Sequence, residues 1–178
     1  MPKSHPYELD LSRKVLRVLL VLNPLFGLFI LGMLIVSIFA SDFMTRALLQ
    51  EHGAEHAMDS QALIAGMRWI MGLGIIGVAL TQVALRRLTS IVDTVSAGDP
   101  FVILNAERLK TIAWVVLGLE MLHFVIGMIA RSVSSEMHPL DLDWKFNLTR
   151  WLVVLFLFVL ARVFEQGARM REDIEGTV

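Results

Sequence analysis

An uncharged, mostly apolar run extends from Val18 to Ser41, between Arg17 and Asp42. A helix needs about 20 such residues to cross the hydrocarbon core of a bilayer, so this run is long enough to cross with some tilt. The apolar core of a cleaved signal peptide is shorter, about 7 to 15 residues, so we expect this segment to stay in the protein. The run therefore predicts a first membrane-spanning helix at about residues 18–40.

Three further apolar segments, at about residues 67–87, 109–130 and 148–164, predict three more spans. Together they predict an all-α fold, a four-helix transmembrane bundle that forms one integral membrane domain over residues 1–178. The fourth span is short, because only residues 151–161 are uncharged, and it crosses only if Arg150 and Arg162 reach opposite interfaces. Within the first span, Asn23-Pro24 is expected to kink the helix or to restart it, because proline lacks a backbone donor.

The composition supports a membrane protein and excludes several classes of function. The 178 residues are 56% hydrophobic and 19% charged, whereas an ordinary soluble domain is nearer half apolar and a quarter charged. The net charge of −1 gives no basic footprint for direct nucleic-acid binding. The chain has no cysteine, which excludes disulfides, thiolate metal sites, iron–sulfur clusters and cysteine nucleophiles.

The distribution of basic residues predicts the orientation of the spans. Positively charged residues gather on the cytoplasmic side of membrane proteins. Eleven of the 16 basic residues lie in the N-terminal tail, the connection between the second and third spans, and the C-terminal segment; they are Lys3, Arg13, Lys14, Arg17, Arg86, Arg87, Arg108, Lys110, Arg162, Arg169 and Arg171. This asymmetry predicts that both termini are cytoplasmic.

The first outer connection contains His52 and His56, four residues apart, with Asp59 close by. Two histidines at this spacing suit zinc or copper if the stretch is helical. The order is not that of the His-Glu-x-x-His zinc proteases, and Gly53 weakens a helix here. We expect this connection to be an exposed polar loop, and we predict no metal site in it. Whether the two histidines bind a metal is left open by the sequence.

The connection between the second and third spans predicts a structured corner. Gly98 is expected to end the incoming helix, with Asp99 capping the next helix and Pro100 at its first position. Alternatively, Asn105 caps the third span and Phe101 lies against the membrane surface. Either arrangement holds two spans in register, so a purely structural corner is the first interpretation of this segment.

The segment also resembles a known family. Gly98-Asp99-Pro100-Phe101, followed by Asn105-Ala106, Arg108-Leu109 and Ile112-Ala113-Trp114, is similar to the signature of the domain-of-unknown-function 2975 family of bacterial membrane proteins. The ending from Phe164 to Val178 resembles the C-terminal tail of that family. The resemblance implies four helices in the bacterial cytoplasmic (inner) membrane and, often, a small helix-turn-helix transcription regulator encoded alongside. It implies no established reaction.

Inside the third span lie an acid and an imidazole, Glu120 and His123, three residues apart on one helical face. An isolated charge at this depth costs roughly 2.5 to 3.5 kcal/mol, so such groups normally face a partner within the bundle. We expect Glu120 to be protonated or bonded to His123. We also expect the pair to point into a seam lined by glycines, which are Gly72, Gly74 and Gly77 of the second span, with Gly27 and Gly32 of the first span at similar depths. The glycines of the second span spell Gly-x-Gly-x-x-Gly, but no strand precedes them, so they do not indicate a dinucleotide site.

No reactive centre is evident. Haem ligation would need a second histidine within a span, a di-iron site would need further intramembrane Glu and His, and no nucleophile with a base is visible. We predict no enzyme activity and no cofactor.

Two functions remain. In the first, the corner, with Asp99, Pro100, Phe101, Asn105 and Arg108, and the tail 165–178 bind a soluble partner, a small DNA-binding regulator, at the membrane. In the second, an oligomer of the chain transports a proton or cation through Glu120 and His123.

Overall fold

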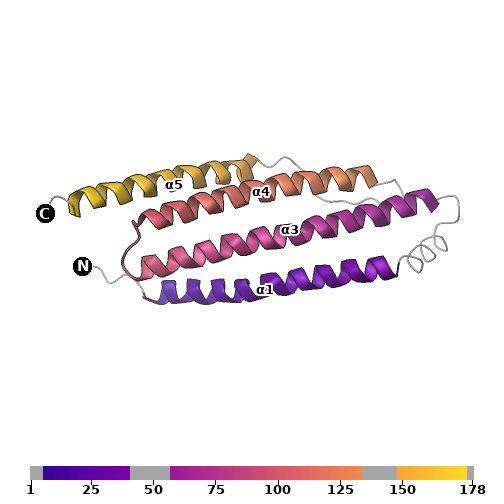
Figure 1. The fold of residues 1–178 in the computed structure, drawn as a ribbon, viewed down its shortest axis with the longest axis horizontal. Helices are drawn as coiled ribbons and strands as arrows, with labels where there is room; N and C mark the ends of the chain where they lie inside the picture. The colour runs from indigo at the N-terminus through magenta and orange to yellow at the C-terminus, as the bar shows by residue number, and fades with distance from the viewer. Residues whose placement is uncertain (1–5, 41–56, 134–147, 176–178) are drawn as a thin grey trace. The chain divides into compact units, whose positions relative to one another are not determined.

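A computed structural model of the protein describes residues 6–40, 57–133 and 148–175, with side chains described within 11–40, 61–133 and 148–173. The helices in these ranges are α1 (Pro6–Phe39), α3 (Ala57–Ser96), α4 (Ile103–Val133) and α5 (Leu148–Glu175) (Figure 1). The described residues contain helices and no strand, which confirms the all-α, four-helix prediction.

Three helical segments are long and apolar enough to cross a membrane: Leu11–Phe39, Gln61–Ser96 and Ile103–Val133. They contain the first three predicted spans. Helix α5 does not qualify, because Arg150, Arg162 and Glu165 interrupt its apolar part. The fourth crossing and the cytoplasmic placement of both termini therefore remain predictions.

The described residues form two compact units. The first contains residues 6–23, 80–120 and 148–175, and thus the start of α1, the end of α3, the start of α4 and all of α5. The second contains residues 24–39, 57–79 and 121–133.

The core of the first unit lies where α3, α4 and α5 meet. Ile91, Leu109, Ile112 and Ala161 are buried there, and partly buried side chains from the same helices pack around them. Ala113 is fully buried, and Trp114 packs edge-on against Phe158 of α5, with ring centroids 5.3 Å apart. Van der Waals contacts of this kind hold α5 against α4, since lipid is as apolar as these side chains and burial from water adds no driving force within a membrane.

Helix α1 continues through Pro24, so of the two outcomes predicted for Asn23-Pro24, a kink or a restart, the restart does not occur. Proline has no N–H, which leaves the carbonyl of Leu20, four residues earlier, without its helical donor. Gln82 of α3 supplies one: its Nε2 donates to Leu20 O at 3.2 Å, and its Oε1 accepts from Asn23 Nδ2 at 2.9 Å. A side chain from a neighbouring helix thus satisfies the backbone group that the proline frees, as membrane helices with proline require.

In the second unit, one glycine of the expected seam, Gly27, packs closely, whereas Gly32, Gly72 and Gly74 do not. A Cβ added to Gly72 would meet no atom within 4 Å, and one added to Gly74 would lie an ordinary 3.8 Å from Ile30 Cδ1. A Cβ on Gly27 would lie 2.8 Å from Val78 Cγ1, and one on Gly66 2.6 Å from Val133 Cγ1. Close packing therefore falls at Gly27 and Gly66, because glycine matters where a neighbouring side chain comes near the backbone. For Gly77 a packing role remains a prediction.

This contact gives a first testable prediction. Gly27→Ala should lower the free energy of unfolding by about 1–3 kcal/mol, because the new methyl group collides with Val78, whose branched side chain adapts poorly. Gly32→Ala is the matched control on the same helix, since nothing lies within 4 Å of its added Cβ. Thermal unfolding in mild detergent should separate the two variants; equal melting temperatures would contradict the close contact at Gly27.

Candidate functional site

Helix α3 is followed by a turn at Gly98, and this glycine ends the helix as predicted. Gly98 has φ of 88°, a left-handed conformation that glycine adopts without the strain a side chain would cause. Its N–H donates to Val95 O at 3.0 Å, and the N–H of Asp99 donates to Thr94 O at 3.1 Å. This pair of bonds is the Schellman pattern, which satisfies carbonyls at the end of a helix and reverses the chain direction.

The start of α4 differs from both predicted arrangements. The helix begins at Ile103, so Asp99 does not cap it and Pro100 does not occupy its first position. Asp99 instead forms an ion pair with Arg171 of α5. Asn105 lies within the first turn of α4 rather than before it, and its N–H donates to Val102 O at 2.9 Å.

Asn105 is the polar centre of this turn. Its side chain is fully buried. Its Nδ2 donates to Thr94 Oγ1 of α3 at 2.8 Å and to Pro100 O at 2.9 Å, and its Oδ1 accepts from Arg108 Nη1 at 2.9 Å. One amide group thereby joins α3, the connection and α4, with both donors and the acceptor used, as a buried polar group requires.

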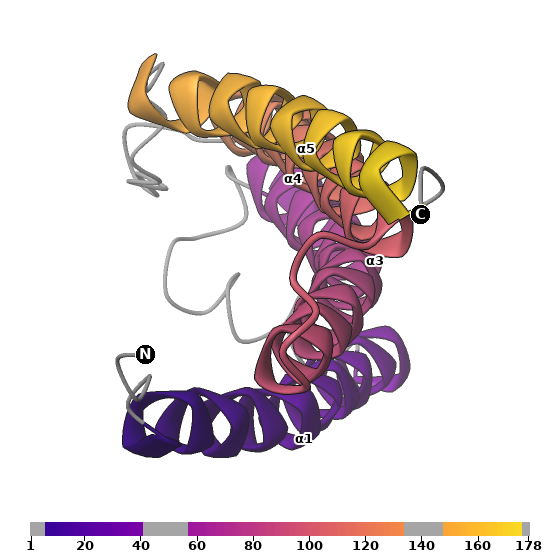
Figure 2. The ribbon, with the colours of Figure 1, turned by 90° about the vertical axis from the view of Figure 1, so that its left-hand side faces the viewer.

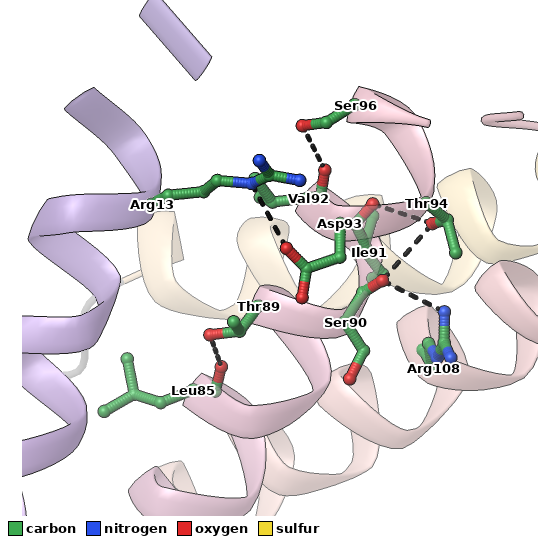
Figure 3. Close-up of polar contacts among 10 residues, drawn as sticks. All are labelled: Arg13, Leu85, Thr89, Ser90, Ile91, Val92, Asp93, Thr94, Ser96 and Arg108. Atoms are coloured by element: carbon green, nitrogen blue, oxygen red, sulfur yellow. Dashed lines mark hydrogen bonds and ion pairs between the residues drawn. The ribbon is translucent and has the colours of Figure 1, made fainter. Parts of the chain in front are cut away.

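Arg108 and Arg13 make further polar contacts with the end of α3 (Figure 3). Arg108 Nη1 also donates to Ser90 O at 3.1 Å. Arg13 of α1 lies with its Nε 3.2 Å from Asp93 Oδ1, an ion pair without hydrogen-bond geometry. Because the Asp93 carboxylate is more than half exposed, this ion pair adds little to the stability of the protein, and its main effect is to position α1 beside α3.

The end of α5 packs onto the same turn (Figure 2). The ring of Phe101 lies 5.4 Å from that of Phe164, centroid to centroid. A Cβ on Gly167 would lie 3.1 Å from Phe101 Cδ1, so a small residue is needed there. Phe101 thus packs on α5, where Gly167 leaves room for its ring, and its placement at the membrane surface stays a prediction.

We call this arrangement the corner: the turn and first α4 residues 99–108 together with α5 residues 164–172. The sequence singled out both segments separately, and the structure brings them together through the Asp99–Arg171 ion pair and the contacts of Phe101. A shallow groove of about 280 Å³ lies between them, lined by Asp99, Leu104, Ala168 and Glu172 among others. Phe101 and Leu104 remain about half exposed, at 46% and 54%.

The intramembrane acid has a different partner from the one expected. Glu120 Oε2 lies 3.9 Å from Arg150 Nη1 of α5, and its side chain is only 19% exposed. His123 belongs to the second unit, and its side chain is exposed. The predicted bond between Glu120 and His123 is therefore replaced by an ion pair between α4 and α5.

Other candidate residues lie outside the described part of the chain. His52 and His56 are among them, as is the side chain of Asp59. Within the described residues, no three His, Asp or Glu side chains are grouped so that they could hold a metal ion.

Sequence reasoning missed Gln82, Thr94 and the partnership of Arg150. A signal existed for Gln82, since a glutamine inside an apolar span needs a partner and Pro24 leaves a carbonyl in need of a donor. Thr94 and Arg150 carry no comparable signal, because their partners are decided by how the helices pack.

The described residues thus define an all-helical protein, with three helices suited to crossing a membrane and a polar corner at one end of its first unit. The chain belongs to the family described as "Protein of unknown function (DUF2975)", whose profile matches residues 52–178. That range includes the corner, α4 and α5, so the resemblance drawn from the motifs is confirmed. No curated protein and no solved structure matches the chain.

Proposed function

We propose that the protein is a membrane-resident interaction partner of a small soluble helix-turn-helix transcription regulator, and that the corner binds this regulator. The observation that carries the proposal is the docking of the α5 end onto the turn, through Arg171 on Asp99 and Phe101 on Gly167. Two segments with separate signatures thereby form one surface.

The chemistry of this surface supports a protein partner. Half-exposed apolar side chains, Phe101 and Leu104, lie beside the charged groups of Asp99 and Arg171. An apolar centre with a polar rim is the usual composition of a protein interface. The buried amide of Asn105 holds the turn in one conformation, which reduces the ordering that binding would require.

The cytoplasmic location of the corner and the class of its partner are supported by separate arguments. The distribution of basic residues predicts that the corner faces the cytoplasm, where a DNA-binding protein could reach it. The bacterial inner membrane is what the family resemblance implies. The regulator itself is suggested by the family resemblance, which is an associational argument.

Affinity purification from native membranes, with the tag at the N-terminus, tests the proposal. We expect a small soluble DNA-binding protein to co-purify with the wild type and with Glu120→Gln, and to be lost when residues 169–178 are deleted. The Glu120→Gln variant is the control for general damage, since it lies away from the corner. If the protein purifies alone, or if the deletion retains the same partner, the proposal fails.

A second candidate is an oligomeric proton- or cation-coupled transporter or channel subunit that uses Glu120 and His123. The observation that favours it is the exposure of His123 on an apolar helix, beside the exposed side chains of Phe124 and Met128. A polar group in that position is stabilised when another copy of the chain covers it. Under this function, Glu120→Gln abolishes ion flux in liposomes and leaves partner binding unchanged.

A further inference from the structure

A second groove, distinct from the one at the corner, lies between α4 and α5 in the first unit. It has a volume of about 430 Å³. Its apolar lining comes from Ile103 and Ala106 of α4 and from Phe158 and Ala161 of α5. Its charged lining consists of Glu107 and Lys110 on α4 and Arg162, Glu165 and Arg169 on α5.

The groove lies where both helices change from apolar to charged. Lys110 is the last charged residue of α4 before the uncharged stretch 111–119, and Arg162 is the first charged residue of α5 after 151–161. On the apolar side of both residues, Trp114 packs against Phe158. Charged residues and tryptophan mark the level of the lipid headgroups in a membrane protein, so the groove opens at that level.

The charges of the groove suit an anion. Glu165 lies 3.3 Å from Arg162 Nη1 and 2.7 Å from Arg169 Nη2, so one carboxylate holds both guanidinium groups beside the groove. The side chains of Arg162 and Arg169 are 72% and 67% exposed. Each guanidinium has five N–H groups, which leaves donors for a ligand, and its planar shape matches the oxygens of a phosphate. With Lys110, the groove has three cations against the two carboxylates of Glu107 and Glu165.

We propose that this groove binds the phosphate headgroup of an anionic phospholipid. Arg162, Arg169 and Lys110 donate to the phosphate, and the adjacent apolar surface of Phe158 and Trp114 takes the first carbons of an acyl chain. The bound lipid connects α4 with α5, the helix whose own sequence is least suited to the membrane. The groove borders the corner and shares part of its lining with it, but lipid binding does not use the Asp99–Arg171 contact, so exchange of Asp99 and Arg171 tests the regulator without altering the groove.

Native mass spectrometry of the full-length protein in detergent, titrated with defined lipids, tests the proposal. We expect phosphatidylglycerol to bind about tenfold more tightly than phosphatidylcholine, given that each basic residue near an anionic surface contributes several-fold. The variant Lys110→Gln/Arg169→Gln should lose this preference. The control Arg86→Gln/Arg87→Gln removes two exposed arginines of α3 outside the groove and should keep it.

Three results would overturn the proposal. The first is equal binding of the two lipids by the wild type. The second is an unchanged preference in Lys110→Gln/Arg169→Gln, or in Lys110→Gln alone, an exposed substitution that serves if the double variant misfolds. The third is displacement of phosphatidylglycerol by equimolar inorganic phosphate, which would assign the groove to a soluble phosphate compound instead of a lipid.

Discussion

The Asn105→Leu variant is expected to unfold at a markedly lower temperature than the wild type. Leucine is of similar size but makes none of the bonds to Thr94, Pro100 and Arg108. The carbonyl of Pro100 and the guanidinium of Arg108 each lose a partner beside a fully buried position. Leaving such groups unsatisfied costs about 2–4 kcal/mol in total, which thermal unfolding in mild detergent measures directly.

Two variants serve as controls for this prediction. Asn105→Asp keeps the oxygen that accepts from Arg108 but loses the amide donors, so its stability should lie between those of the wild type and Asn105→Leu. Glu107→Gln changes an exposed side chain two residues away and should stay within about 0.5 kcal/mol of the wild type. If Asn105→Leu melts together with Glu107→Gln, Asn105 does not hold the turn.

The second large effect is expected at the ion pair between Glu120 and Arg150. Arg150→Leu leaves the carboxylate of Glu120 without its partner among the apolar residues of α4. An unpaired charge in the bilayer costs roughly 2.5 to 3.5 kcal/mol, and the partial exposure of Arg150 lowers the expected loss to about 1–3 kcal/mol. Reversible unfolding in detergent and lipid mixtures provides the measurement.

The double variant Glu120→Leu/Arg150→Leu should recover most of that loss, because it removes both charges together. Recovery in the double variant distinguishes an ion pair from two independent contacts. If the effects of the two single substitutions on the free energy of unfolding simply add, the ion pair between Glu120 and Arg150, at 3.9 Å, does not stabilise the protein.

Much of the fold follows from the sequence, because uncharged runs of sufficient length specify helices that can cross a membrane. The segments at 18–40, 67–87 and 109–130 lie within helices that qualify as spans. How helix α1 accommodates Pro24 could not be predicted from the sequence. A proline in a helix is stable or disruptive according to whether a neighbour satisfies the freed carbonyl, and Gln82 lies 62 residues from Leu20 in the chain.

The candidate site was predictable where the interactions are local. Gly98 ends α3 because only a few residue types adopt its left-handed conformation, and this can be read from a single position. The role of Asp99 was misassigned, and the contact of Phe101 with α5 was not foreseen, because their partners, Arg171 and Gly167, belong to a distant helix. Likewise, Glu120 pairs with Arg150 and not with His123, since the depth of α5 against α4 decides which cation is near.

We propose that the turn and the end of α5 act as one surface for a soluble regulator. Reversal of the charges of Asp99 and Arg171, singly and together, separates this proposal from its alternatives. Both side chains are nearly half exposed, so each single reversal should leave the protein folded while the repelling charges separate α5 from the turn.

Co-purification of the regulator with the tagged protein is the measurement. We expect Asp99→Arg and Arg171→Asp each to reduce the amount of regulator recovered by about tenfold or more, and the double reversal to restore it. Equal recovery with all variants, or no DNA-binding protein recovered with the wild type, would show that the corner does not bind a regulator.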